Sequence, residues 1–276
     1  MNYRHIYHAG NFADIFKHSL LTLLIQNLLL KEKPFCYLDT HAGIGLYDLQ
    51  SVAAQKTREY ESGIVRLLRG KNHPKTLNIY FDIVKKLNSF HIYPGSPYIV
   101  RQLVRACDRL ILLELHKEDI IILKQQFFND KQVAVHYYDG YHGLKAFLPP
   151  KERRGLVLID PPFENRDEFE RIISSLKIGL SRWPTGIYAI WYPIKDRLAI
   201  NKFKHDLRTL NTKSILINEI IVSKENNLSN LFIGCGMVII NPPWQIAIKI
   251  NEVITWLQGI LSPLKFSEKS SSQTDH

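Results

Sequence analysis

The chain has 276 residues, 45% of them hydrophobic and 22% charged, which is enough for one α/β domain with an insertion or for two small domains. No apolar run reaches the roughly 18 residues of a membrane span, and the N-terminus lacks a signal-peptide layout, so we expect a cytoplasmic protein without membrane contacts. Three scattered cysteines argue against a disulfide framework or a metal site. The net charge of +10 indicates a polyanionic partner, most commonly nucleic acid.

The N-terminal third predicts an arm, a helix, a strand and an insertion. Residues 1–14 are rich in His, Tyr and Asn without periodicity and predict a partly ordered arm. Asp14 is expected to cap a helix over residues 15–30. A buried strand follows over residues 35–39. Residues 46–93 then show helical segments with eight basic and four acidic residues, which predicts a helical insertion of net charge +4.

Strands and helices alternate along the rest of the chain. Strands are predicted at residues 35–39, 109–114, 133–137, 155–160, 186–191, 213–222 and 234–240. This alternation predicts an α/β fold with a mostly parallel, seven-stranded sheet. The last two strands are joined without a helix and must pair antiparallel, which is the Rossmann-like layout of class I methyltransferases.

This layout divides the chain into parts. Residues 1–45 and 94–265 are predicted to form the methyltransferase domain, and residues 46–93 form a helical insertion subdomain beside its ligand edge. The Ser- and Lys-rich tail, residues 266–276, is predicted to be disordered.

The run from Gly155 to Phe163 carries most of the functional information. Its apolar residues predict a strand buried on both faces, which Pro161 and Pro162 must end directly after Asp160. A carboxylate, a backbone carbonyl and the ring of Phe163 therefore meet at the carboxyl end of a strand, where ligands bind in open α/β sheets. This group predicts a clamp for a planar base that carries an amine.

Three further acids end earlier strands. Asp39 precedes a turn with Gly43 and Gly45, Glu114 can accept both hydroxyls of a ribose, and Asp139-Gly140 can accept from an adenine amine. Each is also explained by an ordinary turn or cap. Their order, followed by Asp160, predicts a nucleoside cofactor beside the base clamp. The glycines do not fit a dinucleotide GxGxxG pattern, which argues against a nicotinamide dehydrogenase.

A second run of the same form is Asn241-Pro242-Pro243-Trp244. If the final strand is antiparallel, its end lies at the opposite edge of the sheet, away from the cofactor. We therefore interpret Trp244 as a packing or helix-start residue.

The N-terminal arm interleaves aromatic and basic side chains, which suits stacking on bases and pairing with phosphates. These residues include Tyr3, Arg4, His5, Lys17 and His18. Lys17 and His18, at the start of a helix, can also hold a cofactor carboxylate. A surface arm that only covers the sheet is the alternative.

At these residues the sequence resembles the bacterial large-subunit (23S) ribosomal RNA adenine-N6 methyltransferases of the RlmJ family. Besides the Asp-Pro-Pro-Phe run, the resemblance is carried by three segments: residues 3–18, residues 38–43 and residues 93–97. It extends over nearly the whole chain except the tail. Phe163 departs from the tyrosine that is common in the clamp.

The resemblance implies a site for S-adenosylmethionine and no metal. Its cofactor contacts would be His18, His41, Ser96, Glu114, Asp139, Gly140 and Asp160. Asp160, Pro161 and Phe163 would act on the flipped-out base, and Tyr3, Arg4, His5 and Lys17 would lie near the RNA substrate.

The sequence thus predicts a monomeric enzyme that methylates N6 of an adenine in 23S ribosomal RNA, as protein-free RNA or an early assembly intermediate. Adenine N6 methylation of DNA stays open, because the clamp does not distinguish RNA from DNA. A non-catalytic RNA-binding module is a further alternative. Methylation of a protein glutamine is disfavoured by the basic charge and by Asp160, where Asn is more usual.

Overall fold

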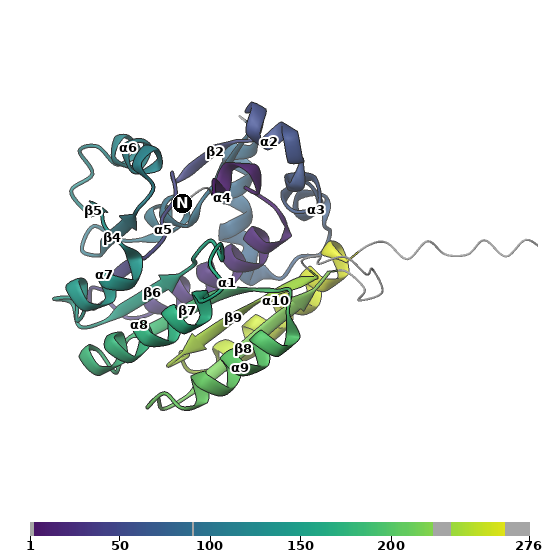
Figure 1. The fold of residues 1–276 in the computed structure, drawn as a ribbon. Helices are drawn as coiled ribbons and strands as arrows, with labels where there is room; N and C mark the ends of the chain where they lie inside the picture. Colours follow the sequence, from purple (N-terminus) through teal and green to yellow (C-terminus); the bar gives the residue numbers. More distant parts are fainter. Residues whose placement is uncertain (1–2, 90, 223–232, 263–276) are drawn as a thin grey trace, which may run out of the picture.

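The computed structural model describes residues 3–89, 91–222 and 233–262, so the predicted tail lies outside the described residues. Its centre is a seven-stranded sheet with helices on both faces (Figure 1). The strands are β1 (Cys36–Asp39), β4 (Arg109–Glu114), β5 (Val133–Tyr137), β6 (Gly155–Ile159), β7 (Ile187–Ile194), β8 (Ile215–Ile221) and β9 (Gly234–Ile240). Their order is β5-β4-β1-β6-β7-β9-β8, and β9 runs antiparallel to both β7 and β8. The predicted fold class, with its antiparallel last strand, is confirmed.

The two faces of the sheet carry separate cores. In β4, Leu110 and Leu112 join one core, and Ile111 and Leu113 join the other, because successive side chains of a strand point to opposite faces. The first core takes side chains from α1 (Phe12–Leu29), α5 (Ser96–Leu103), α6 (Lys117–Gln126) and α10 (Ile246–Leu261). The second takes them from α7 (Gly140–Phe147), α8 (Glu168–Arg182) and α9 (Arg197–Arg208).

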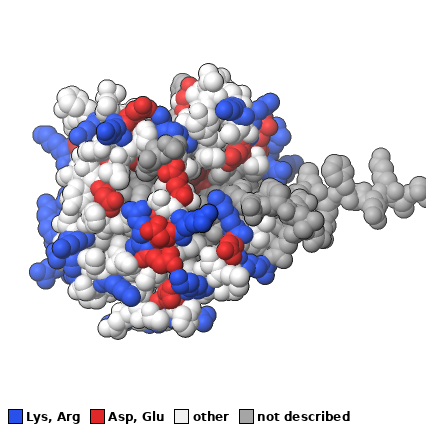
Figure 2. Space-filling model, viewed as in Figure 1, with Lys and Arg blue, Asp and Glu red and all other residues white. Residues whose placement is uncertain are grey.

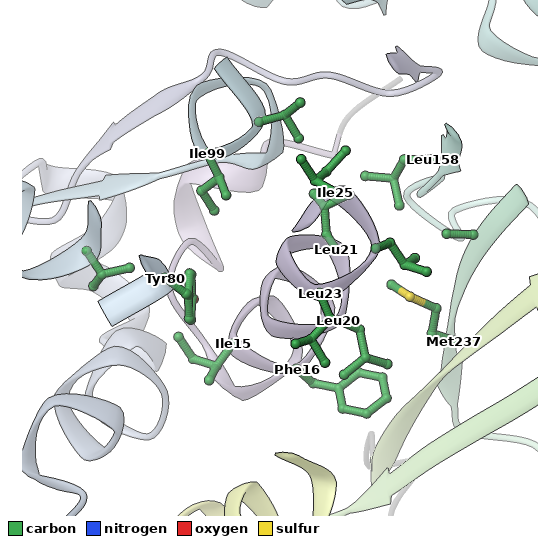
Figure 3. Close-up of a cluster of buried hydrophobic side chains, with 14 of the residues drawn as sticks. Ile15, Phe16, Leu20, Leu21, Leu23, Ile25, Tyr80, Ile99, Leu158 and Met237 are labelled. Atoms are coloured by element: carbon green, nitrogen blue, oxygen red, sulfur yellow. The ribbon is translucent and has the colours of Figure 1, made fainter. Parts of the chain in front are cut away.

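Helix α1 lies inside the first core and is buried on nearly all sides. Figure 3 shows its side chains facing Tyr80, Ile99, Leu158 and Met237, which come from four other elements. A helix that is apolar around its whole circumference is expected to be buried in this way.

The helix begins earlier than predicted, because Asn11 and not Asp14 caps it. The Asn11 side chain accepts hydrogen bonds from the backbone N–H groups of Ala13 and Asp14. The Asp14 carboxylate instead accepts from the N–H of Gly10 and contacts two side chains of the candidate site.

The insertion starts and ends in a short strand pair that the sequence did not indicate. β2 (Leu46–Asp48) pairs antiparallel with β3 (Ile92–Pro94). Between them lie α2 (Val52–Thr57), α3 (Ile64–Arg69) and α4 (Asn78–Asn88). Their apolar side chains, including Leu67 and Tyr80, join the same core as α1.

Strand β7 runs to Ile194, beyond the predicted end at residue 191. Its pairing with β6 stops at Ile190, whereas its pairing with β9 continues to Ile194. Pro193 is tolerated because it follows the last pair with β6. The next helix, α9, begins at Arg197 and is capped by Asp196. Within the described ranges, none of the helices has both the length and the apolar character needed to cross a membrane.

Candidate active site

A cavity of about 480 Å³ opens at the carboxyl ends of β1, β4 and β6, a volume in the usual range for ligand pockets. Ten of the predicted site residues line it: Tyr3, His5, Lys17, His18, His41, Ser96, Glu114, Asp160, Pro161 and Phe163. They come from the arm, from helix α1, from the start of helix α5 and from the ends of three parallel strands. The fold therefore brings together residues that are more than 150 positions apart in the chain.

Three predicted site residues are not among those that line this cavity. Arg4 pairs with Glu118 at 2.6 Å and with Asp119 at 3.3 Å. Asp139 caps helix α7. At Gly140 a Cβ atom would lie 2.2 Å from the carbonyl oxygen of Thr40, so the close approach of the start of α7 to the end of β1 requires glycine there.

An ion-paired chain of side chains connects the arm to the clamp. The ammonium of Lys17 lies 2.5 Å from Asp160 and 2.9 Å from Asp14. Asp14 also contacts Nε2 of His5 at 2.9 Å, and Nδ1 of His5 hydrogen-bonds to the hydroxyl of Tyr3 at 2.8 Å. Although burial raises the pKa of Asp14, the neighbouring His5 and Lys17 hold it well below its usual range. Although burial lowers the pKa of Lys17, Asp14 and Asp160 raise it well above its usual range.

The insertion anchors the arm through Glu59, a residue that sequence reasoning missed. Its carboxylate contacts Nδ1 of His8 at 2.8 Å and accepts from the side-chain amide of Asn11 at 2.9 Å. The ring of Tyr3 stacks on His8 with centroids 5.4 Å apart. Asp14 was also missed as a site residue, although its spacing of three from Lys17 on one helix was a signal for an ion pair.

At the end of β1, Asp39 is completely buried. Its carboxylate accepts hydrogen bonds from the hydroxyls of Tyr37 and Ser96, both at 2.7 Å. Burial raises the pKa of Asp39 to about 6, and the two hydroxyls oppose this shift. Ser96 is thus fixed at the cavity wall by Asp39.

At the end of β4, the backbone holds both oxygens of Glu114. The N–H of Gly43 donates to Oε2 at 2.8 Å, and the N–H of His116 donates to Oε1 at 2.7 Å. Gly43 has φ +63°, which glycine adopts without strain. Each carboxylate oxygen keeps a further lone pair, so Glu114 is an oriented acceptor that lines the cavity. Burial raises its pKa.

Two histidines of the cavity are uncharged near neutral pH. Burial lowers the pKa of His18 to about 3 and that of His41 to about 4. His18 Nδ1 hydrogen-bonds to the hydroxyl of Tyr93 at 2.7 Å. The hydroxyl of Thr40 donates to the Leu158 carbonyl and lies 2.8 Å from Nδ1 of His41. Nδ1 of His41 is therefore the donor, and its Nε2 is left as an acceptor.

Phe163 takes a left-handed backbone conformation, with φ +51°, directly after the two prolines. Its ring makes edge contacts with Phe169 and Trp191, at centroid distances of 5.2 and 5.8 Å. Strained backbone of this kind concentrates at functional sites. The loop thereby holds an aromatic ring beside Asp160.

The rival run at Asn241 lies at the other edge of the sheet, as its topology predicts. β9 is antiparallel to β7, and the side-chain amide of Asn241 donates to the carbonyls of Pro184 and Gly186. The packing role suggested for Trp244 was wrong, because its side chain is 86% exposed. Trp244 instead stands directly before Gln245, the cap residue of α10.

Three comparisons relate the chain to known proteins. Residues 32–271 match the family model described as Ribosomal RNA large subunit methyltransferase D, RlmJ. Two proteins named Ribosomal RNA large subunit methyltransferase J, from Escherichia coli (strain K12) and Haemophilus influenzae, are each 42% identical over 95% of both chains. The crystal structure of a Legionella pneumophila protein is 39% identical, with a TM-score of 0.84 over 93% of this chain and 95% of that one.

Proposed function

The chain belongs to the RlmJ family of large-subunit ribosomal RNA methyltransferases, and on this basis we propose that it transfers a methyl group from S-adenosylmethionine to N6 of an adenine in 23S ribosomal RNA. The target base would be flipped out of its stack into the cavity. The observation that carries the proposal is the position of Asp160: it follows β6 and lines the cavity, and the neighbouring parallel strands β1 and β4 also end in acids.

The residues around the cavity fit a nucleoside cofactor. Glu114 is a fixed acceptor for ribose hydroxyls at a strand end, as in other nucleotide-binding α/β sheets. Ser96 and the neutral imidazoles of His18 and His41 offer hydrogen bonds around the rest of the molecule without adding charge. When bound, the cofactor supplies an electrophilic methyl group.

The clamp supplies acceptors for the amine of the target base. An exocyclic amine is a weak nucleophile because its lone pair is delocalised into the ring. Asp160 and the carbonyl of Pro161 would accept its two N–H bonds and favour a pyramidal nitrogen, which stabilises the transition state more than the ground state. Lys17 already occupies one oxygen of Asp160, and its contact with Asp14 keeps the ammonium fixed as the amine enters. Alignment of the reacting atoms supplies much of the remaining rate gain.

Charge supports RNA as the substrate. The chain carries a net +10, and Figure 2 shows many Lys and Arg side chains along the outline of one face, and further ones near its middle, where they lie among Asp and Glu side chains. Basic groups can hold the phosphates of RNA, while the carboxylates of the cavity act on an uncharged base. We further propose that the enzyme is cytoplasmic, acts as a monomer and uses protein-free 23S RNA or an early assembly intermediate. We also propose that residues 46–93 form a helical insertion subdomain.

The deciding experiment measures transfer of a labelled methyl group from S-adenosylmethionine to protein-free 23S RNA, to a matched duplex DNA and to assembled large subunits. We expect N6-methyladenine in the free RNA by mass spectrometry. We expect no measurable transfer by Asp160→Ala, although this variant still binds S-adenosylhomocysteine. Transfer to DNA alone would contradict the RNA substrate, and near-normal turnover by Asp160→Ala would contradict the site.

A further inference from the structure

The two carboxylate oxygens of Asp139 have different surroundings. Oδ1 accepts hydrogen bonds from the backbone N–H groups of Tyr141 and His142, at 2.9 and 3.0 Å, and so caps helix α7. Oδ2 faces the guanidinium of Arg171 across 3.7 Å. This separation is beyond hydrogen-bond distance, and within the described ranges no hydrogen bond reaches Oδ2. Oδ1 of Asp139 therefore serves as the helix cap, and Oδ2 is available as an acceptor beside the positive charge of Arg171.

Arg171 is fixed in its place by two other groups. Its guanidinium lies 4.4 Å from the centre of the Tyr141 ring, and its Nη1 donates to Glu168 at 3.2 Å. The same Glu168 oxygen accepts from the hydroxyl of Tyr141 at 2.5 Å. Glu168 is 2% exposed, whereas the Arg171 side chain is 37% exposed, so only the Glu168 side of this arrangement is shielded from water. The planar guanidinium of arginine can stack on a ring and donate several N–H bonds at once, and a lysine ammonium is a poor substitute for it.

The arrangement lies beside the cofactor end of the cavity. Tyr141 also makes an edge contact with His41, which lines the cavity, at a centroid distance of 5.3 Å. Glu168 is the first residue of α8, the helix that follows the clamp loop. Arg171 is thus placed between the clamp loop and Asp139, the acid that follows β5.

From this geometry we propose that Arg171 is a positioning residue that orients Oδ2 of Asp139 toward the exocyclic amine of the cofactor's adenine, and so makes the enzyme select an adenine-bearing cofactor. The inference rests on the proposed function, since it assumes S-adenosylmethionine as the methyl donor. Arg171 does not itself touch the base. Its charge offsets that of the carboxylate, and at 3.7 Å it leaves the Oδ2 lone pairs available for the amine.

The test compares two ligands by isothermal titration calorimetry, S-adenosylhomocysteine and S-inosylhomocysteine. The second carries an oxygen in place of the amine and so presents an acceptor to Oδ2. Hydrogen bonds to charged groups are strong enough for the wild type to prefer the adenosyl ligand by about tenfold or more. We expect Arg171→Gln to reduce this preference to about twofold, mainly through weaker binding of the adenosyl ligand, and Arg171→Lys to retain part of it.

Two further variants make the result specific. Asp139→Asn keeps a good cap residue for α7 but replaces the acceptor, so it should also lose the preference. Lys177→Gln, on an exposed position of the same helix, should leave it unchanged. Equal weakening of both ligands by Arg171→Gln, or an unchanged ratio, would overturn the inference alone. Failure of the wild type to bind either ligand would overturn the proposed function as well.

Discussion

Lys17 and Asp160, 143 residues apart in the chain, form a 2.5 Å ion pair in the wall of the cavity. The Lys17 side chain is 6% exposed, and its second partner, Asp14, is 1% exposed. Removal of one member of a buried ionic group leaves an uncompensated charge, which is far more costly than the net gain from the pair. Lys17 therefore contributes to folding as well as to the site.

We expect Lys17→Met to lower the free energy of unfolding by about 3–5 kcal/mol, as measured by urea denaturation. The reason is that Asp14 and Asp160 then face each other without a cation. The double variant Lys17→Met/Asp14→Asn should recover a substantial part of the loss, since one of the two carboxylates is neutralised. If the loss in the double variant equals the sum of the losses in Lys17→Met and Asp14→Asn alone, the two charges are not coupled.

A second prediction concerns the pH dependence of stability that Asp39 introduces. Its pKa is about 6 in the folded protein, against an ordinary value of 3.8. Between these values the folded state binds more protons than the unfolded state, so this residue lowers stability as the pH rises from about 4 to 6. Asp39→Asn should remove that fall and stabilise the protein at pH 7 by up to about 3 kcal/mol.

The measurement is the difference in the free energy of unfolding between wild type and Asp39→Asn from pH 4 to 8. Taking the difference is necessary because His18 and His41 act in the opposite direction. Their pKa values are lowered by burial, so their contribution is lost as the pH falls below about 6.5. A difference that does not change with pH would contradict the raised pKa of Asp39.

The third prediction tests the ring of Phe163. Stacking of an aromatic side chain on a base contributes about 1–3 kcal/mol, so Phe163→Ala should lower kcat/KM for RNA by roughly five- to a hundredfold. Phe163→Tyr keeps the ring and should retain most of the activity. Steady-state methyl transfer to 23S RNA measures both variants. An alanine variant as active as the tyrosine variant would show that the ring does not stack on the base.

The sequence predicts the sheet well because apolar runs and strand ends are local signals. Val133–Tyr137 and Gly234–Ile240 are found at their predicted bounds, and the antiparallel last strand follows from the missing helix. The edge on which Asp160 and Glu114 meet also follows, because parallel strands place their carboxyl ends together.

The contacts between side chains could not be predicted in the same way. The partners of Asp160 and Glu59 are distant in the chain, and no local pattern encodes such pairs. The choice between Asn11 and Asp14 as helix cap is decided by His5 and Lys17, which hold the Asp14 carboxylate elsewhere. The exposed Trp244 shows that a local pattern can also mislead, because an aromatic residue near a strand end does not have to pack into the core.

The last prediction tests whether the insertion holds RNA phosphates. Arg66 donates to a backbone carbonyl at the end of α10, and Arg58 forms an ion pair with Glu61, so both are engaged within the protein. Lys71 and Lys75 are exposed on the segment before α4 and are better candidates. Each phosphate contact contributes about 0.7–0.9 to the slope of log K against log salt. Lys71→Gln/Lys75→Gln should therefore weaken RNA binding and flatten the slope by roughly one to two in a filter-binding titration.

The matched variant Lys71→Arg/Lys75→Arg keeps both charges and should keep the slope, because counterion release depends on charge and not on the shape of the cation. If the glutamine variant binds with the wild-type slope, RNA follows another face of the protein and the insertion serves only to anchor the arm.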